Sequence, residues 1–206
     1  TYLAGTQIRG AVPKAIIVPH AGFIYSGPIA ASAYARLAPA RDTIRRVVLM
    51  GPSHRVAFRG LAVTSATAYA SPLGTVPIDR EAVDRLASLP EVGVLEAAHG
   101  PEHSLEVHLP FLQVVLDRFS LVPIVAGQAA PATVAKVLET VWGGPETVIV
   151  ISSDLSHYLD YRSAQALDAS TRAAIESLDP AAIGHDQACG RVPVSGLLMA
   201  ARSHHL

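Results

Sequence analysis

The sequence has little charge and almost no cysteine. Its single cysteine, Cys189, excludes an internal disulfide, so we expect a reducing cytoplasm as the compartment, with the thiol free for packing, redox chemistry or a metal. Sixteen basic and seventeen acidic residues leave a formal net charge of −1. This balance lacks the basic footprint of a nucleic-acid binder. No run of like charges indicates an anionic membrane surface either.

Long hydrophobic runs are also missing. Apolar stretches such as Val47–Met50 and Val148–Ile151 are the size of a strand, whereas a membrane span needs roughly 20 residues. We find no signal peptide, lipidation motif, internal repeat or low-complexity tract. With 206 residues, half of them hydrophobic, the chain is long enough for one domain with a large core. We therefore predict a single domain over residues 1–206.

Short apolar runs alternate with helical patterns along the chain. Strands are predicted at Lys14–Pro19, Arg46–Gly51, Gly60–Thr64, Leu121–Ala126 and Thr147–Ile151. Helices are predicted at Pro28–Leu37, Asp79–Leu89, Pro101–Arg118, Ala132–Val141, Ala164–Leu178, Pro180–His185 and Val194–Ala201. Pro28 is expected in the first turn of its helix, and Pro110 should kink or end the regular part of the third. This order predicts an α/β fold, a three-layer α/β/α sandwich with a mainly parallel central sheet.

Three predicted strands run directly into polar residues. His20 follows the first, His54 follows the second, and Asp154 follows the strand at 147–151, with His157 three residues later. The carboxyl ends of parallel strands share one edge, where ligands bind, so these groups would converge if the strands are neighbours. A single loop histidine more often bonds to a nearby carbonyl, but the joint pattern favours a pocket.

A second dense cluster lies in Glu102-His103-Ser104-Leu105-Glu106-Val107-His108. Near the start of its predicted helix, His103 could reach the pocket as an acid, a base or a hydrogen-bond donor. On such a helix His103 and His108 diverge, so His108 is expected to support structure. Cys189 is either a buried apolar residue or a soft ligand beside two imidazoles for iron, copper or zinc. The residues alone leave these two roles equal.

Hydrolytic chemistry is not favoured. Ser152, Ser153, Asp154 and His157 are triad-type residues, but the sequence has no G-x-S-x-G elbow, and Asp154 and His157 are unusually close. The absence of H-E-x-x-H argues against a zincin metalloprotease.

Five ordered motifs resemble the Memo family, whose bacterial and archaeal members are often called AmmeMemoRadiSam system protein B. They span residues 19–191, nearly the whole chain: Pro-His-Ala-Gly-Phe-Ile-Tyr-Ser-Gly at 19–27, Gly-Pro-Ser-His at 51–54, Glu-His-Ser-Leu-Glu-Val-His-Leu-Pro at 102–110, Ser-Ser-Asp-Leu-Ser-His at 152–157 and Cys-Gly-Arg at 189–191.

The resemblance implies a fold like that of class III extradiol (LigB-type) dioxygenases, which hold Fe(II) with two histidines and a glutamate. In Memo proteins the corresponding pocket has two histidines and a cysteine, which fall here on His20, His54 and Cys189 as metal ligands. Asp154, His157 and His103 match further residues of the same cleft, as catalytic candidates. A thiolate in place of a carboxylate softens the site, so iron (Fe2+) or copper is expected, and zinc also fits.

The resemblance also bears on length and partners. Family members continue past the helix after Cys-Gly-Arg with further strands, and this sequence ends at His204-His205-Leu206 before them. A sheet without those strands would expose an edge strand. The family name implies AMMECR-type and radical SAM proteins as partners.

The sequence is compatible with three functions. The first is a metal-dependent oxidoreductase of the Memo type, with an unknown substrate. The second is a non-enzymatic module that binds a small molecule, peptide or protein in the cleft that corresponds to the dioxygenase active site. The third is metal storage or delivery without turnover.

Overall fold

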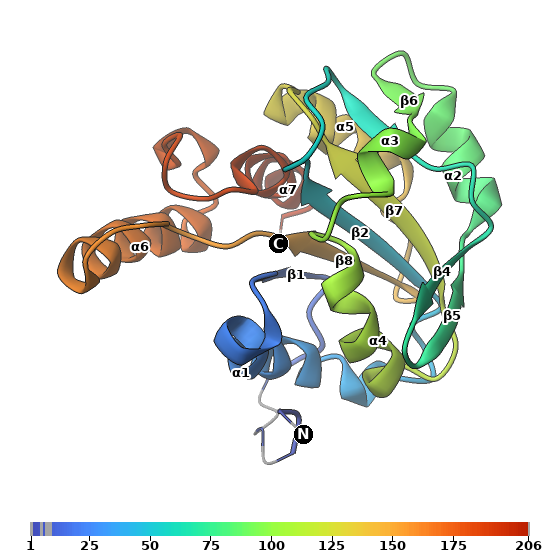
Figure 1. Ribbon diagram of the computed structural model, residues 1–206, viewed down its shortest axis with the longest axis horizontal. Helices are drawn as coiled ribbons and strands as arrows, with labels where there is room; N and C mark the ends of the chain where they lie inside the picture. Colours follow the sequence, from blue (N-terminus) through green and yellow to red (C-terminus); the bar gives the residue numbers. More distant parts are fainter. Residues whose placement is uncertain (1, 5, 7–9, 206) are drawn as a thin grey trace.

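The computed structural model describes residues 2–4, 6 and 10–205 of the chain. Its centre is a sheet of six strands in the order β1-β8-β2-β7-β3-β6 (Figure 1). The strands are β1 (Ala15–Val18), β2 (Arg46–Pro52), β3 (Leu61–Val63), β6 (Val92–Val94), β7 (Ser120–Ala126) and β8 (Thr147–Ser152). All neighbouring pairs are parallel except β3 with β7. The predicted mainly parallel sheet is confirmed.

The central strands are apolar without alternation because both faces of the sheet are covered. Along β2, Val47 and Leu49 pack into the cluster on one face, Val48 and Met50 into the cluster on the other, and all four are 0% exposed. Two packed faces require a continuous apolar strand instead of an alternating one. The sheet is therefore the middle layer of three.

Helices from separate parts of the chain form the outer layers. One face is covered by α1 (Phe23–Ala35), α3 (Glu96–His99) and α4 (Leu109–Val115), and the other by α2 (Arg80–Ala87), α5 (Pro131–Thr140) and α7 (Arg191–Ser203). Figure 1 shows α1 and α4 on one side of the sheet, with α5 and α7 on the other. The three-layer α/β/α sandwich expected from the sequence is confirmed.

The remaining elements lie at the periphery. The strands β4 (Ala68–Ser71) and β5 (Gly74–Pro77) form a separate antiparallel hairpin. Helix α6 (Tyr161–Glu176) projects from the body of the molecule in Figure 1, with Thr171 and Ala174 as its buried residues. Within the described part of the chain, three short 3-10 turns complete the list: η1 (Ala38–Ala40), η2 (Glu106–His108) and η3 (Pro180–Ala182). The hairpin, β6 and α3 were not predicted from the sequence.

Some expected helices have boundaries set by their caps. Asp79 caps α2 by accepting a hydrogen bond from the backbone N–H of Ala82, as its sequence position predicted. The helix expected at 164–178 begins three residues earlier, because Asp160 caps it at the N–H groups of Arg162 and Ser163. Helices α5 and α7 likewise agree with their predicted positions to within a few residues.

The helix predicted over 101–118 forms only at Leu109–Val115. The chain forms a turn up to Leu105, then η2, then α4, which ends at Val115. Two physical causes act here. The carboxylate of Glu102 binds the N–H groups of the next two residues and holds the turn. Pro110 lies in the first turn of α4, where a missing N–H costs nothing, and so starts a helix instead of kinking one.

Two smaller predictions also fail. Helix α1 starts at Phe23, so Pro28 lies inside it and not in its first turn. Pro28 is exposed, so water can replace the lost backbone hydrogen bond. The helix expected at 180–185 shortens to η3, because the N–H of Gly184 donates to the side chain of Gln187 instead of continuing a helix.

Among the described residues, no helix is both long and apolar enough to cross a membrane.

Candidate metal centre

Three neighbouring strands deliver the polar groups that the sequence singled out. The strands β1, β8 and β2 are adjacent, and their carboxyl ends lie at one edge of the sheet. His20 lies two residues beyond β1, Asp154 two beyond β8, and His54 two beyond β2. The condition for convergence, neighbouring strands, is therefore met. Sequence spacing alone did not establish it.

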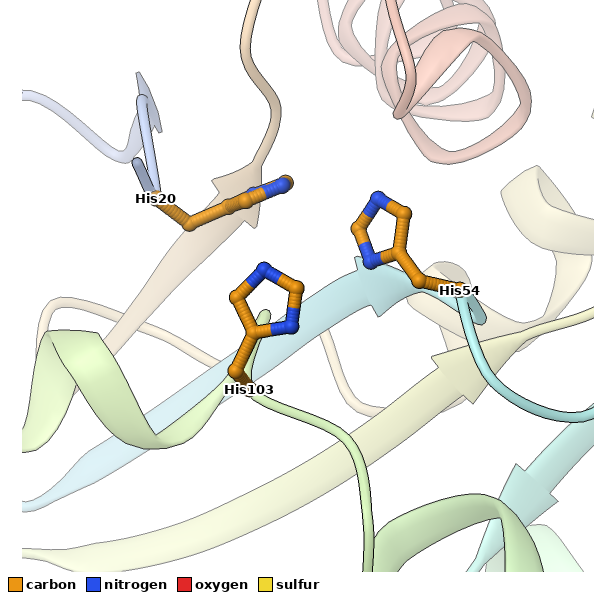
Figure 2. Close-up of side chains that lie close together, drawn as sticks. All are labelled: His20, His54 and His103. Carbon is orange, nitrogen blue, oxygen red and sulfur yellow. The ribbon is translucent and has the colours of Figure 1, made fainter. Parts of the chain in front are cut away.

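Three imidazole rings meet at this edge. His20, His54 and His103 each place a ring nitrogen within 4.8 Å of the others (Figure 2). Their ring centroids are 5.1 Å apart for His20 and His54, 5.6 Å for His20 and His103, and 5.0 Å for His54 and His103. Figure 2 shows the rings coming from three separate segments, with His103 carried by the turn before α4. Imidazole nitrogens at this spacing are a suitable donor set for a transition metal.

A second group of donors shares His20. The Sγ of Cys189 lies 3.5 Å from Nε2 of His20, and Oδ2 of Asp154 lies 3.7 Å from the same nitrogen. Ligand atoms of these three residues are also within 4.8 Å of one another. Cys189 stands just before α7 and accepts the backbone N–H of Asp154 at 3.3 Å. The structure thus contains a His/Asp/Cys cluster beside the three imidazoles.

The two groups of three overlap only at His20. His54 belongs to one and Cys189 to the other. The ligand set His20, His54 and Cys189, expected from the resemblance, therefore spans both groups and stays a prediction. His20 is 2% exposed, the His54 side chain 29% and the His103 side chain 42%. The site is therefore buried at His20 and open to solvent at His103.

Glu102 holds His54 and the turn that carries His103. Its carboxylate accepts Nδ1–H of His54 at 3.0 Å and the backbone N–H groups of His54, His103 and Ser104. Burial by itself would raise the pKa of Glu102, but the hydrogen bonds from His54 and Ser104 outweigh it and lower the pKa to about 2. Glu102 is therefore an anion that orients His54, a function that the sequence analysis missed. Its place directly before His103 was the available signal.

Burial determines the charge of His20 and Cys189, at the buried end of the site. It lowers the pKa of His20 to about 4, an effect that nearby Asp154 only partly opposes, so the ring is neutral near pH 7. Burial also raises the pKa of the Cys189 thiol. Nδ1 of His20 lies 2.6 Å from Oγ of Ser152, and Oδ1 of Asp154 accepts the backbone N–H of His20 at 2.8 Å. A neutral histidine offers a lone pair to a metal without first losing a proton.

Two other histidines from the sequence motifs lie outside both groups. His157 is exposed, and its ring lies 5.9 Å from that of Tyr158. Its expected acid/base role stays a prediction. His108 is 1% exposed and contacts Ser152 at 2.8 Å, in agreement with its expected structural role.

Two hollows adjoin the cluster. A groove of about 930 Å³ runs between α1 and α6, and Ala21 and Ser153, neighbours of His20 and Asp154, form part of its wall. A smaller pocket of about 340 Å³ is lined by Ser53 and Cys189 among others. A small ligand therefore has room in either hollow, next to the metal-type donors.

The chain matches a known protein family. A family model described as "Memo-like protein" matches residues 3–205. A "MEMO1 family protein" of Aquifex aeolicus is 39% identical over 171 residues, covering 81% of this chain and 62% of the relative. Another of Methanothermobacter thermautotrophicus is 34% identical, covering 92% of this chain and 72% of the relative.

A vertebrate relative is similar to the same extent. "Protein MEMO1" of Danio rerio is 33% identical over 230 residues, covering 97% of this chain and 76% of the relative. The chain thus spans between 62% and 76% of the length of these three relatives. The matched residues 3–205 include all five ordered motifs of residues 19–191. The chain belongs to the Memo family.

Proposed function

We propose that this protein binds one transition-metal ion at the edge of its sheet and acts there as a metal-dependent oxidoreductase. The observation that carries the proposal is the convergence of three imidazoles, with Cys189 and Asp154 beside the most buried one. Structural metal sites satisfy all positions of the ion with protein ligands, whereas this cluster is open at its His103 side. An open position is what substrate binding requires.

The donors present fit a metal. Glu102 takes the Nδ1–H of His54, which leaves Nε2 of that ring free to coordinate. His20 is buried and neutral, so its lone pair is available as well. Imidazole and thiol donors together suit iron(II) and copper and are also compatible with zinc. The thiol of Cys189 shifts the preference toward copper.

A bound iron or copper ion would supply one-electron redox chemistry. The protein's own groups would orient the reactants. Asp154 is fixed by the backbone N–H groups of His20 and Ala21 through Oδ1, which leaves Oδ2 directed at the cluster. His103 stands at the open side, as a further ligand or as a proton carrier. His157, on the loop between β8 and α6, would be a second proton carrier.

The first test is anaerobic reconstitution with Fe(II) and, separately, with Cu(I). We expect about one ion per chain for the wild type, and strongly reduced uptake for His54→Ala and Cys189→Ser. His204→Ala, whose ring stacks on Trp142, is the matched control and should bind like the wild type. Failure of the wild type to take up either ion would overturn the proposal.

The redox step is tested separately by oxygen consumption of the reconstituted protein in the presence of a reductant. Oxygen consumption by the reconstituted wild type that exceeds that of the free ion, and is absent from the metal-free protein, would support an oxidoreductase. An ion that is bound without oxygen consumption, and passes completely to a chelator, would instead favour metal handling.

A second candidate is a binding module that uses the groove between α1 and α6. Large apolar side chains stand exposed along it, among them Ile29 at 63% and Tyr161 at 76%. Exposed apolar surface of this kind marks many sites of peptide or protein association. AMMECR-type and radical SAM proteins are the partners proposed for it. This candidate predicts that His54→Ala abolishes metal uptake and leaves partner binding intact.

A further inference from the structure

Ser152 lies beneath the metal-type cluster and joins two buried histidines. Its Oγ is 2.6 Å from Nδ1 of His20, 2.8 Å from Nε2 of His108 and 2.6 Å from the backbone carbonyl oxygen of Ser104. Ser152 and Ser104 are 0% exposed, and the two histidines are 2% and 1% exposed. The hydroxyl therefore has three close polar neighbours in a nearly dry environment.

Counting protons determines the direction of each hydrogen bond. A serine hydroxyl carries one hydrogen, and a carbonyl oxygen only accepts. At 2.6 Å, the oxygens of Ser152 and Ser104 would repel each other unless that hydrogen lay between them. The single hydrogen of Ser152 is thus given to the carbonyl of Ser104. Both imidazoles must then donate to Ser152.

His108 gives independent support for this assignment. Its Nδ1 is buried and has no hydrogen-bond partner among the described residues. If Nε2 were the acceptor, Nδ1 would carry a buried N–H with nothing to bond, and such orphaned donors are rare. If Nε2 is the donor, Nδ1 carries only a lone pair, which is a less costly arrangement. His108 therefore occupies one acceptor position of Ser152 as a donor.

We propose that Ser152, held by Ser104 and His108, is a positioning residue that fixes His20 in the tautomer with the proton on Nδ1 and the lone pair on Nε2. That lone pair faces Sγ of Cys189 at 3.5 Å and Oδ2 of Asp154 at 3.7 Å. The Asp154 carboxylate attracts a proton to Nε2, so it favours the opposite tautomer. Ser152, the closer partner, outweighs it.

The consequence concerns the metal. A neutral histidine coordinates through the nitrogen that bears no proton, and the hydrogen bond of the other nitrogen selects which one that is. Ser152 would thereby keep Nε2 of His20 ready for an ion, as Glu102 does for His54 with a carboxylate. This inference rests on the proposed metal site, but the tautomer is measurable without any ion.

The test is long-range 1H–15N NMR of the histidine rings in the metal-free protein. We expect a protonated Nδ1 and an unprotonated Nε2 for His20 in the wild type. Ser152→Ala should move His20 toward the Nε2–H form, and Ser152→Thr, which keeps a hydroxyl, should restore the wild-type spectrum. Ser104→Ala is the matched control, because it removes a buried hydroxyl nearby and keeps the backbone carbonyl that Ser152 needs.

Metal titration of the same variants gives the second readout. Ser152→Ala should weaken metal affinity by roughly 10–100-fold, and Ser152→Thr should recover most of it. An Nε2–H tautomer in the wild type, or an unchanged tautomer in folded Ser152→Ala, would overturn the inference. Absence of metal binding in a wild type with the expected tautomer would count against the proposed function and leave the tautomer assignment standing.

Discussion

The carboxylate of Glu102 lies 3.0 Å from Nδ1 of His54 and also accepts the backbone N–H of that residue. One buried anion thus fixes both the ring and the main chain of a candidate ligand that is 48 residues away in sequence. Through the N–H groups of His103 and Ser104 it fixes the turn that supplies the third imidazole. Glu102 couples two of the three rings.

Glu102→Gln should weaken metal affinity by roughly 10–100-fold, because an amide cannot accept all these donors and leaves His54 free to turn. The measurement is competition with a chelator of known affinity, corrected for the folded fraction. Glu96→Gln is the control, since Glu96 also accepts a backbone N–H, from Ser65, but belongs to neither group of metal-type donors. Equal losses for both variants would refute the orienting role of Glu102.

The metal-free protein should lose stability as the pH falls below about 6.5, in part because of His108. Burial lowers the pKa of His108 from 6.5 to about 3. Between these values the unfolded chain binds a proton that the folded one excludes, so the free energy of unfolding decreases with falling pH. One such group contributes a slope of about 1.4 kcal/mol per pH unit.

Chemical denaturation at several pH values measures that slope. His108→Gln should reduce it between pH 6 and 5, where His20 keeps contributing, whereas His205→Gln, at an exposed position, should keep the wild-type slope. The range above pH 4.5 separates this effect from Glu102, whose lowered pKa contributes stability that is lost only at more acid pH. A wild-type slope in folded His108→Gln would contradict the assignment.

Gly190→Ala should destabilise the fold and displace Cys189. A Cβ at this position would lie 2.6 Å from the backbone oxygen of Ser152 and 2.6 Å from Cβ of Ser153, so the backbone must move. Overpacking of this kind costs about 1–3 kcal/mol. Gly93→Ala is the control, because nothing lies within 4 Å of the added carbon there. Denaturation midpoints and thiol reactivity of Cys189 provide the two measurements.

Removing the ring of His103 should lower metal affinity, whereas removing that of His157 should not. His103 shares the three-imidazole group, and His157 is exposed outside it. Calorimetric titration of His103→Ala and His157→Ala with Fe(II) or Cu(I) compares them directly. Tighter or unchanged binding in His103→Ala would exclude this ring as a ligand.

Local sequence patterns predicted much of the fold. Apolar runs such as Val47–Met50, separated by capped helices, indicated a covered, mainly parallel sheet, because a strand with two packed faces has no polar side. His20, His54 and Asp154 each follow a predicted strand, so they were expected at the carboxyl edge of the sheet. The helix predicted from Pro101 to Arg118 is absent from its first part, because a periodic leucine pattern does not reveal that the Glu102 carboxylate accepts the backbone N–H groups there.

By itself the sequence determined the α/β class, the family motifs and the polar residues that follow each strand, since each depends on local periodicity or on residue identity. The tertiary structure alone decided the strand order β1-β8-β2, the division of donors between two groups that share His20, and the bonds from Glu102 and Ser152. These contacts join segments up to 169 residues apart. Their geometry depends on how whole layers pack, and no local pattern encodes that.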